Sequence, residues 1–229
     1  MPGMDGTGEL FGPLLGVMSG RWRHRVVAYP ADRAMSYEEL LPLVEERVPR
    51  GRPVVLVAES FSGPLALRYA AAHPGWVRAV VLCASFISSP VPRWVSHLVF
   101  DGLFRMPMPS PAVRLLLVGW DAPRSLVELV RRVIQRVRPG VLAYRVRQVM
   151  ELDCQDALAR CNAPVLYLRA GHDRIVGTGC ARRIVAAGRN VTVRRVDGPH
   201  LLLQAEAHAA WGVVEEFLGA GVEIGARTP

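Results

Sequence analysis

Short apolar runs recur along the chain and are separated by longer stretches with helical periodicity. The runs cover residues 25–30, 53–58, 79–84, 164–170 and 191–196. The first four are nearly continuous in Val, Leu and other apolar residues, which is typical of parallel strands buried on both faces. Because these strands alternate with helical patterns, the sequence predicts an α/β fold with a mostly parallel sheet flanked by helices.

The segments between the apolar runs predict helices over residues 37–48, 63–73, 178–187 and about 201–218. The first of these has a clear start signal. Ser36 stands before it and Glu39 follows three residues later, which is the spacing of a capping box.

The alternation breaks once, between residues 87 and 158, where no strand pattern is present. This stretch begins as a Pro-rich apolar segment and continues as amphipathic helices. In one of them an apolar face is formed by Leu126, Val127, Val130, Val133, Ile134 and Val137. We therefore expect residues 87–158 to form a helical cap inserted after the third strand, and residues 1–86 and 159–229 to form the core.

Length and composition fit one globular α/β domain with an inserted subdomain. The chain has 229 residues, of which 51% are hydrophobic and 21% are charged. No uncharged apolar run reaches about 18 residues, so we expect no membrane span. No basic segment followed by an apolar one stands at the start, so we also expect no signal peptide and a cytoplasmic location. The four cysteines show neither CxxC nor a zinc-site spacing with histidine, so we expect reduced thiols and no metal. The glycine-rich start lacks the lysine of a phosphate-binding loop and does not match G-x-G-x-x-G, and we expect no cofactor.

The net charge of +8 raises the question of nucleic-acid binding, and the pattern of charges argues against it. All 28 basic residues are arginine and none is lysine, which indicates a codon bias rather than a binding surface. The arginines are scattered and the basic and aromatic signatures of known nucleic-acid modules are missing. A basic surface of this kind remains suited to an anionic partner.

The segment "AESFSG" ends the second apolar run with a cluster of small residues that contains two serines. A nucleophile elbow turns so sharply from strand to helix that the residues two before and two after the nucleophile must be small. With Ser60 as nucleophile these flanks are Ala58 and Ser62. With Ser62 they would be Ser60 and Pro64, and proline fits the tight point poorly. Ser60 is the better candidate, although Ala58 and Ser62 replace the glycines of G-x-S-x-G.

Two later segments offer the partners that a nucleophilic serine needs. Asp173 follows the strand at 164–170, and His200 follows the strand at 191–196. Taken singly, each is equally compatible with an ordinary loop residue. Their order Ser…Asp…His at successive strand ends predicts a catalytic triad. His172 and Asp197 are weaker alternatives, the latter because "DGP" is a turn former.

Four motifs in order, "PGMDGTG", "AESFSGP", "AGHDRIV" and "DGPHLLLQ", resemble the α/β-hydrolase superfamily over essentially the whole chain. The resemblance implies an α/β-hydrolase fold, with an oxyanion hole formed by the backbone N–H groups of Met4 and Phe61. It also implies that the cap lines an acyl pocket. Candidate pocket residues, which are equally compatible with packing inside the cap, are Phe104, Met106, Met108 and Trp120.

The chain departs from this family's pattern at its beginning. In the family a central strand precedes the "PGMDG" loop and lies between the strands that match 25–30 and 53–58. Here the sequence starts at Met1, where that strand should already have ended. We therefore expect the first central strand to be missing from this sequence, with its place filled by an upstream segment or by a partner chain.

The function predicted from these residues is a serine hydrolase of the carboxylesterase type acting on small-molecule acyl esters. The same residues fit a thioesterase or acyltransferase. The cap and the basic surface also resemble esterases that hydrolyse the methyl ester of a pimeloyl group on an acidic acyl carrier protein. The alternative from another class is a catalytically idle binding module of the same fold. A homo-oligomer is compatible with any of these.

Overall fold

The computed structural model describes residues 1–18, 20, 22–49, 51–92 and 98–219. At its centre lies a four-stranded sheet with the order β1-β2-β3-β4, in which every neighbouring pair is parallel. The strands are β1 (Val54–Glu59), β2 (Val77–Cys83), β3 (Val165–Ala170) and β4 (Val191–Val196). They correspond to four of the five predicted apolar runs.

Helices connect and cover these strands, as parallel pairing requires. The α-helices are α1 (Gly12–Val17), α2 (Tyr37–Arg47), α3 (Gly63–Ala72), α4 (Ser110–Val113), α5 (Arg124–Arg136), α6 (Pro139–Glu151), α7 (Gln155–Arg160), α8 (Thr178–Ala187), α9 (Leu202–Ala205) and α10 (Ala207–Gly219). Shorter or wider helical turns are η1 (Glu9–Phe11), η2 (Ser60–Ser62), η4 (Asp101–Phe104) and η5 (Arg114–Val118).

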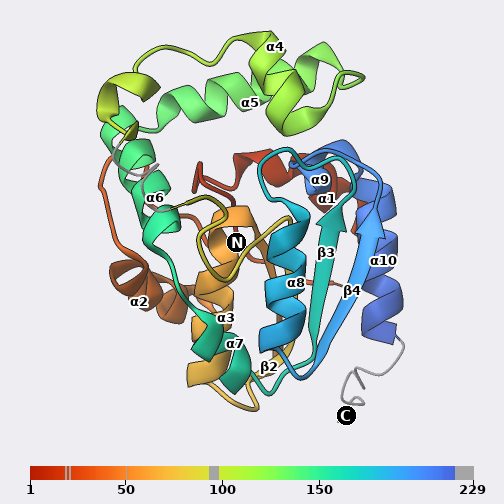
Figure 1. The fold of residues 1–229 in the computed structure, drawn as a ribbon. Helices are drawn as coiled ribbons and strands as arrows, with labels where there is room; N and C mark the ends of the chain where they lie inside the picture. The colour runs from red at the N-terminus through yellow and green to blue at the C-terminus, as the bar shows by residue number, and fades with distance from the viewer. Residues whose placement is uncertain (19, 21, 50, 93–97, 220–229) are drawn as a thin grey trace.

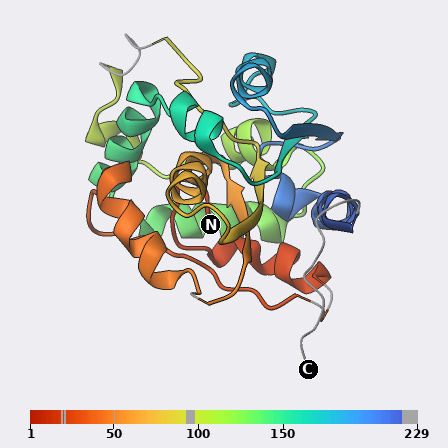
Figure 2. The same ribbon diagram turned by 90° about the horizontal axis from the view of Figure 1, so that it is seen from below.

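The two faces of the sheet carry two separate hydrophobic cores. On one face, α2, α3, α7 and α8 pack against side chains such as Leu56, Leu82 and Tyr167. On the other, α1, α9 and α10 pack against the alternate side chains, such as Val81 and Leu168. The red α1 and the dark-blue α10 lie together on one side of the strands in Figure 2, with the gold α3 on the other. The sheet is therefore the middle of three layers.

Between β2 and β3 the chain forms the predicted helical insertion. Figure 1 shows α4 and α5 together at the top, away from the sheet, while α6 and α7 lead back to β3. The apolar face predicted for α5 is confirmed, because Leu126, Val127, Val130 and Val133 are buried together in one hydrophobic cluster. This cluster includes Leu10 and Leu201, so the insertion packs onto the core.

Other helix predictions differ from the structure only in detail. The capping box of α2 is confirmed: Ser36 Oγ accepts the Glu39 N–H, and a Glu39 carboxylate oxygen accepts the Ser36 N–H at 2.7 Å. The helix predicted over 201–218 is instead two helices, because the backbone leaves the helical region at Glu206.

The strand predicted over residues 25–30 is wrong. Residues 22–30 have no regular secondary structure, and Tyr29 N–H donates to the Gly6 carbonyl of a loop at 2.7 Å. A cavity separates this segment from β1, so it has no strand to pair with. Its apolar pattern reflects packing instead, since Val27 is buried in one core and Val26 packs against the other.

Candidate active site

The turn from β1 into α3 holds Ser60 in a conformation that few residues other than glycine adopt. Ser60 has φ 47°, in the left-handed region. It is the first residue of the short η2 turn, so the chain passes from strand to helix within three residues. Backbone strain of this kind persists only when its surroundings hold it, and it concentrates at functional sites.

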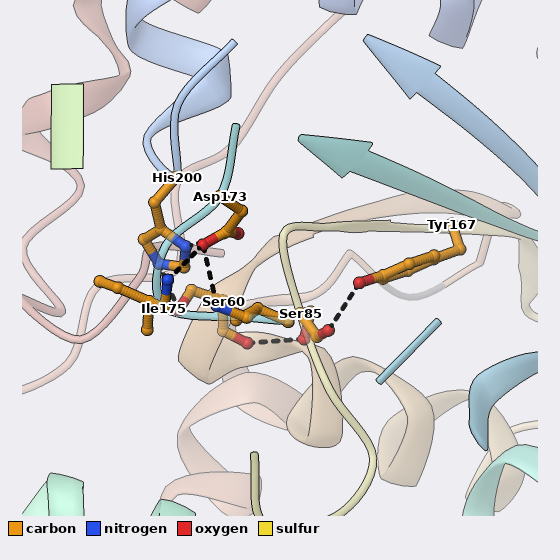
Figure 3. A network of polar contacts seen from close by, with 7 residues as sticks. Ser60, Ser85, Tyr167, Asp173, Ile175 and His200 are labelled. Carbon is orange, nitrogen blue, oxygen red and sulfur yellow. Dashed lines mark hydrogen bonds and ion pairs between the residues drawn. The ribbon is translucent and has the colours of Figure 1, made fainter. Parts of the chain in front are cut away.

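The turn is held from the neighbouring strand. Ser85, just after β2, donates its hydroxyl to the Ser60 carbonyl at 2.7 Å, and Tyr167 on β3 donates to the Ser85 carbonyl at 3.1 Å (Figure 3). This contact requires glycine at position 63, because a Cβ there would overlap the Ser85 hydroxyl. The small residues of "AESFSG" therefore serve two purposes: a sharp turn and a close approach to β2.

Ser60, His200 and Asp173 lie in one hydrogen-bonded row. His200 Nε2 is 3.1 Å from Ser60 Oγ, and His200 Nδ1 is 2.8 Å from Asp173 Oδ2 (Figure 3). An ionised carboxylate only accepts hydrogen bonds, so Nδ1 carries the proton and Nε2 is free to accept the Ser60 hydroxyl proton. All three side chains come from segments that follow strands: Ser60 follows β1, Asp173 follows β3 and His200 follows β4.

The Asp173 carboxylate is itself oriented by the backbone. Its other oxygen, Oδ1, accepts the N–H groups of Ile175 and Val176, both at 2.8 Å. The His200 and Asp173 side chains are 5% and 3% exposed, so their contact is shielded from water. Charge-assisted hydrogen bonds in such a site fix the imidazole in one tautomer and one orientation.

The weaker alternatives from the sequence lie elsewhere. Asp197 forms an exposed ion pair with Arg195 at 2.7 Å. His172 is exposed, and its backbone N–H donates to the Gly198 carbonyl at 2.9 Å. The structure brings neither into the row formed by His200.

The loop that contains Met4 passes next to the serine. A Cβ added at Gly3 would lie 3.9 Å from Ser60 Cβ, and Gly6 N–H donates to the Gly3 carbonyl at 3.1 Å to close a turn. Ser62 ties this loop to the turn at Ser60, because its hydroxyl donates to the Pro2 carbonyl. The Tyr29 hydroxyl lies 2.7 Å from Ser62 Oγ. Ser62 is thus more than a small flanking residue.

Arg145, which the sequence reasoning missed, fastens the same loop from α6. This buried side chain donates to the carbonyls of Met4, Asp5 and Pro30 at 2.8, 2.9 and 2.7 Å. Its guanidinium also lies 5.8 Å from the centre of the Phe61 ring, within cation–π range. A signal was present in the sequence, because Arg145 falls on the buried stripe of α6 that includes Val141, Leu142 and Val149.

Phe61, the residue after the candidate nucleophile, is completely buried and rigidly placed. Its ring stacks on Tyr37 with centroids 4.7 Å apart and lies edge-on to Tyr29. The Tyr37 hydroxyl donates to the Phe61 carbonyl at 3.1 Å. Two successive carbonyls of the turn are therefore fixed, that of Ser60 by Ser85 and that of Phe61 by Tyr37.

Glu59, just before Ser60, is a buried carboxyl group. It accepts one hydrogen bond from Gln204 Nε2 at 3.2 Å, while its other oxygen has no partner among the described residues. Burial raises the pKa of Glu59 to about 7, against the opposing effects of His200 and Gln204. A second titratable group therefore stands directly behind the candidate triad.

The four cap residues considered for an acyl pocket do not gather at one point. Phe104 packs against a cluster of Val137, Val141 and Leu142 that Met4 also contacts, and Met108 packs against the α5 cluster. Met106 and Trp120 are 78% and 59% exposed.

Neither a metal centre nor a membrane helix is evident in the part of the chain that the structure describes. Within these residues no group of three or more His, Cys, Asp or Glu side chains could hold a metal ion. In the same ranges, no helix has the length and apolar character needed to cross a bilayer. All four cysteines, Cys83, Cys154, Cys161 and Cys180, are buried and free.

Comparison with known proteins places this geometry in context. A family model described as "Alpha/beta hydrolase family" matches residues 2–211, while no curated protein matches the chain. A thermophilic esterase from Thermogutta terrifontis is similar at 18% identity and a TM-score of 0.66, over 82% of this chain and 74% of that one. An enol-lactonase from Burkholderia xenovorans LB400 is similar at 17% and 0.74, over 94% and 88%. A bromoperoxidase from Bacillus anthracis is similar at 15% and 0.77, over 93% and 88%. At these identities the likeness shows the fold, which is the one expected from the four motifs.

Proposed function

The chain belongs to the alpha/beta hydrolase family, and we propose that it is a serine hydrolase that cleaves carboxylic esters through an acyl-enzyme on Ser60. The observation that carries this proposal is the row of two hydrogen bonds from Ser60 through His200 to Asp173. Fold alone would not support it, because one fold hosts many activities.

In the proposed reaction His200 Nε2 removes the proton from Ser60 Oγ, which attacks the ester carbonyl carbon. The imidazolium that results is stabilised by Asp173 and then gives its proton to the departing alkoxide. This leaves the acyl group on Ser60 Oγ. Water, activated by His200 in the same way, attacks the acyl carbon and releases the acid and the free serine.

The backbone N–H groups of Met4 and Phe61 are proposed to stabilise the oxyanion that forms in each half-reaction. Support comes from the rigid placement of both residues, Met4 by Arg145 and Phe61 by Tyr37. One oxyanion-hole donor is worth roughly 2.7–4 kcal/mol of transition-state stabilisation. The fixed backbone requires little reorganisation when the charge develops.

The substrate is proposed to approach from the side of the helical insertion, residues 87–158, which we treat as the cap. Phe104 and Met4 pack against one cluster, which favours Phe104 as a wall of the acyl site. Met106, Met108 and Trp120 are proposed as outer contacts. The narrower proposals for the substrate are an ester, a thioester, or a methyl ester on an acidic carrier protein. The net charge of +8 favours the last of these.

A hydrolysis panel tests both the activity and its range. Purified protein is given p-nitrophenyl esters with acyl chains of two to sixteen carbons, an acyl-thioester, and an acyl methyl ester on a carrier protein. We expect saturable hydrolysis of at least one ester, and its loss in Ser60→Ala. Folded wild-type protein that hydrolyses none of them above the Ser60→Ala background would contradict the proposal and favour the idle binding module.

A further inference from the structure

His200 lies in a short segment without regular secondary structure, between β4 and α9. Two backbone hydrogen bonds flank the histidine and tie this segment to other parts of the chain. On the N-terminal side, the Gly198 carbonyl accepts the His172 N–H at 2.9 Å. On the C-terminal side, the Leu201 N–H donates to the Leu117 carbonyl at 2.8 Å. The first partner belongs to the core, whereas the second belongs to the helical insertion.

The Leu117 carbonyl can accept this bond because of its place in the insertion. Leu117 is the last residue but one of η5, and the final carbonyls of a helix have no partner within it. Gly119, with φ 83°, ends the helix, and its N–H donates to the Arg114 carbonyl at 2.9 Å. The Arg114 side chain donates to the Trp120 and Ala122 carbonyls, both at 2.6 Å. The helix end that receives the bond is therefore itself held in place.

The side chains on both sides of His200 also face the insertion. Leu201 is buried in a hydrophobic cluster whose other buried members, apart from Leu10, come from α4, η5 and α5. Pro199 lies 3.7 Å from the position that a Cβ on Gly119 would take. In Figure 1, α9 lies below the end of the insertion that contains α4, and η5 continues from α4. The histidine is therefore carried by a segment that packs under the insertion.

The insertion is also fastened to the core at other points. The Arg138 N–H donates to the Ala31 carbonyl at 2.9 Å. The Arg136 side chain forms an ion pair with Glu9 of η1. Arg145 holds the loop at residues 4 and 5 through its three hydrogen bonds to carbonyls. A part of the chain with buried contacts along its length opens at a high cost in free energy, so the insertion does not have the character of a loose lid.

The position of the His200 backbone bears directly on proton transfer. Nε2 lies 3.1 Å from Ser60 Oγ while Nδ1 lies 2.8 Å from Asp173 Oδ2, so the imidazole has to satisfy two distances at once. Asp173 sets the tautomer and the rotation of the ring, but the backbone sets how far the ring stands from Ser60. A misplacement of about 1 Å can cost about 10²-fold in rate. Contacts that fix the backbone beside His200 therefore matter for catalysis.

We propose that Leu201 is a positioning residue for His200, and that the insertion acts through it as a fixed part of the active site rather than as a movable lid. The hydrogen bond to the Leu117 carbonyl and the buried Leu201 side chain set the distance between the imidazole and Ser60. Substrate then reaches Ser60 past this end of the insertion without displacing it. This inference rests on the proposed function, since it concerns the base of that reaction.

Two leucine-to-alanine variants of the full chain test the proposal. Leu201→Ala removes packing beside His200, whereas Leu126→Ala, the matched control, removes it from α5 in the same cluster. The two side chains belong to residues that are 7% and 8% exposed, so both variants should lower the urea midpoint by similar amounts. We expect Leu201→Ala to lower kcat on a p-nitrophenyl ester about tenfold or more with KM nearly unchanged, and Leu126→Ala to keep kcat within about twofold of wild type.

Two further readouts separate positioning from a general loosening of the structure. The second-order rate of fluorophosphonate labelling at Ser60 depends on the base but not on the ester. It should fall in Leu201→Ala by the same factor as kcat. Leu201→Met, which nearly conserves the volume of the side chain, should bring both rates back to within about threefold of wild type.

Two measurements by nuclear magnetic resonance do not depend on turnover. In wild-type protein the Leu201 N–H should exchange with solvent about 10²-fold or more slowly than an exposed amide. The far-downfield resonance of the His200 Nδ1 proton reports the bond to Asp173. It should be present in wild type and Leu126→Ala, and broadened or lost in Leu201→Ala. Both measurements read the position of the His200 segment whether or not an ester is hydrolysed.

The outcomes distinguish this inference from the proposed function. Folded Leu201→Ala protein that keeps kcat and the labelling rate within about twofold of wild type would overturn the role of Leu201, and so would an equal loss in Leu126→Ala. Rapid exchange of the Leu201 N–H in wild type would also overturn it, because the insertion would then open at this end. Inert wild-type protein in which the exchange and the resonance behave as expected would contradict the esterase activity and support the positioning.

Discussion

Replacing Arg145 by methionine tests whether the insertion holds the loop of Met4, a proposed oxyanion-hole donor, in place. The substitution keeps much of the apolar stem and removes the three hydrogen bonds to the Met4, Asp5 and Pro30 carbonyls. Burial lowers the pKa of Arg145, and the nearby Asp5 carboxylate raises it. The substitution therefore also leaves the Asp5 carboxylate without its cation. Two separate losses should follow, one in stability and one in rate.

The size of each loss follows from the contacts. Removing one partner from a buried, charged hydrogen-bond network costs about 3–5 kcal/mol, so we expect a loss of that order in the free energy of unfolding. A complete loss of one oxyanion donor costs about 10²–10³ in kcat. Because the Ser62–Pro2 contact remains, the loop should shift rather than detach, and we expect a fall in kcat of about 10- to 100-fold.

Urea unfolding and ester hydrolysis measure the two effects on the same preparation. Arg147→Met is the matched control, since Arg147 lies on the same helix and donates one hydrogen bond to the Val99 carbonyl at 3.1 Å, away from the loop. It should lose about 1 kcal/mol of stability or less and keep its kcat. An Arg145→Met protein that is folded at the assay temperature and keeps the wild-type kcat would refute this reasoning.

Three further predictions concern the residues around the nucleophile. Asp173→Asn should lower kcat about 10⁴-fold in ester hydrolysis with little change in folding, because the wrong imidazole tautomer then faces Ser60. Gly63→Ala should lower the free energy of unfolding in urea by about 2–3 kcal/mol, because its Cβ overlaps the Ser85 hydroxyl, whereas Gly212→Ala, with open space around it, should not destabilise. Glu59→Gln should remove a pH-dependent loss of stability. Folding raises the pKa of Glu59 from 4.5 to about 7. The contribution of this carboxyl to the free energy of unfolding is therefore present in full below pH 4.5 and is lost as the pH rises through 7. At about 1.4 kcal/mol per pKa unit, the loss is about 3 kcal/mol. Urea unfolding of wild type and Glu59→Gln at pH 5 and pH 8 measures that difference.

Each of these has an outcome that would count against it. Wild-type kcat in Asp173→Asn would mean that another group orients the imidazole. Equal stability of the two alanine variants would mean that Ser85, after β2, does not pack closely against Gly63 in the turn. A wild-type and Glu59→Gln difference that stays constant from pH 5 to pH 8 would mean that Glu59 titrates as an ordinary exposed carboxyl.

The parts of this fold that depend on local pattern could be predicted from the sequence. The capping box of α2 and the buried face of α5 are local, since three or four residues of spacing decide them. The four strands of the sheet follow from their apolar runs. The prediction of a strand at 25–30 was wrong because a strand also needs a neighbouring strand to pair with, and these residues face a cavity instead.

To predict that Ser60, Asp173 and His200 lie close together, one further principle was needed. The carboxyl ends of parallel strands share one edge, so residues that follow β1, β3 and β4 converge there. Arg145 could not be placed in this way, because its partners at 4, 5 and 30 come from loops that no periodicity locates. Side-chain contacts between loops depend on the complete tertiary structure. The positions of the residues in the sequence therefore say little about which of them will be in contact.

Covalent labelling tests the central claim most directly. A fluorophosphonate reacts only with a serine whose hydroxyl is activated, and the site is read by mass spectrometry of the digested protein. We expect wild-type protein to gain one adduct on Ser60, His200→Ala to label far more slowly, and folded Ser60→Ala to remain unlabelled. Wild-type protein that is folded and stays unlabelled, or that carries its adduct on another serine, would contradict the account.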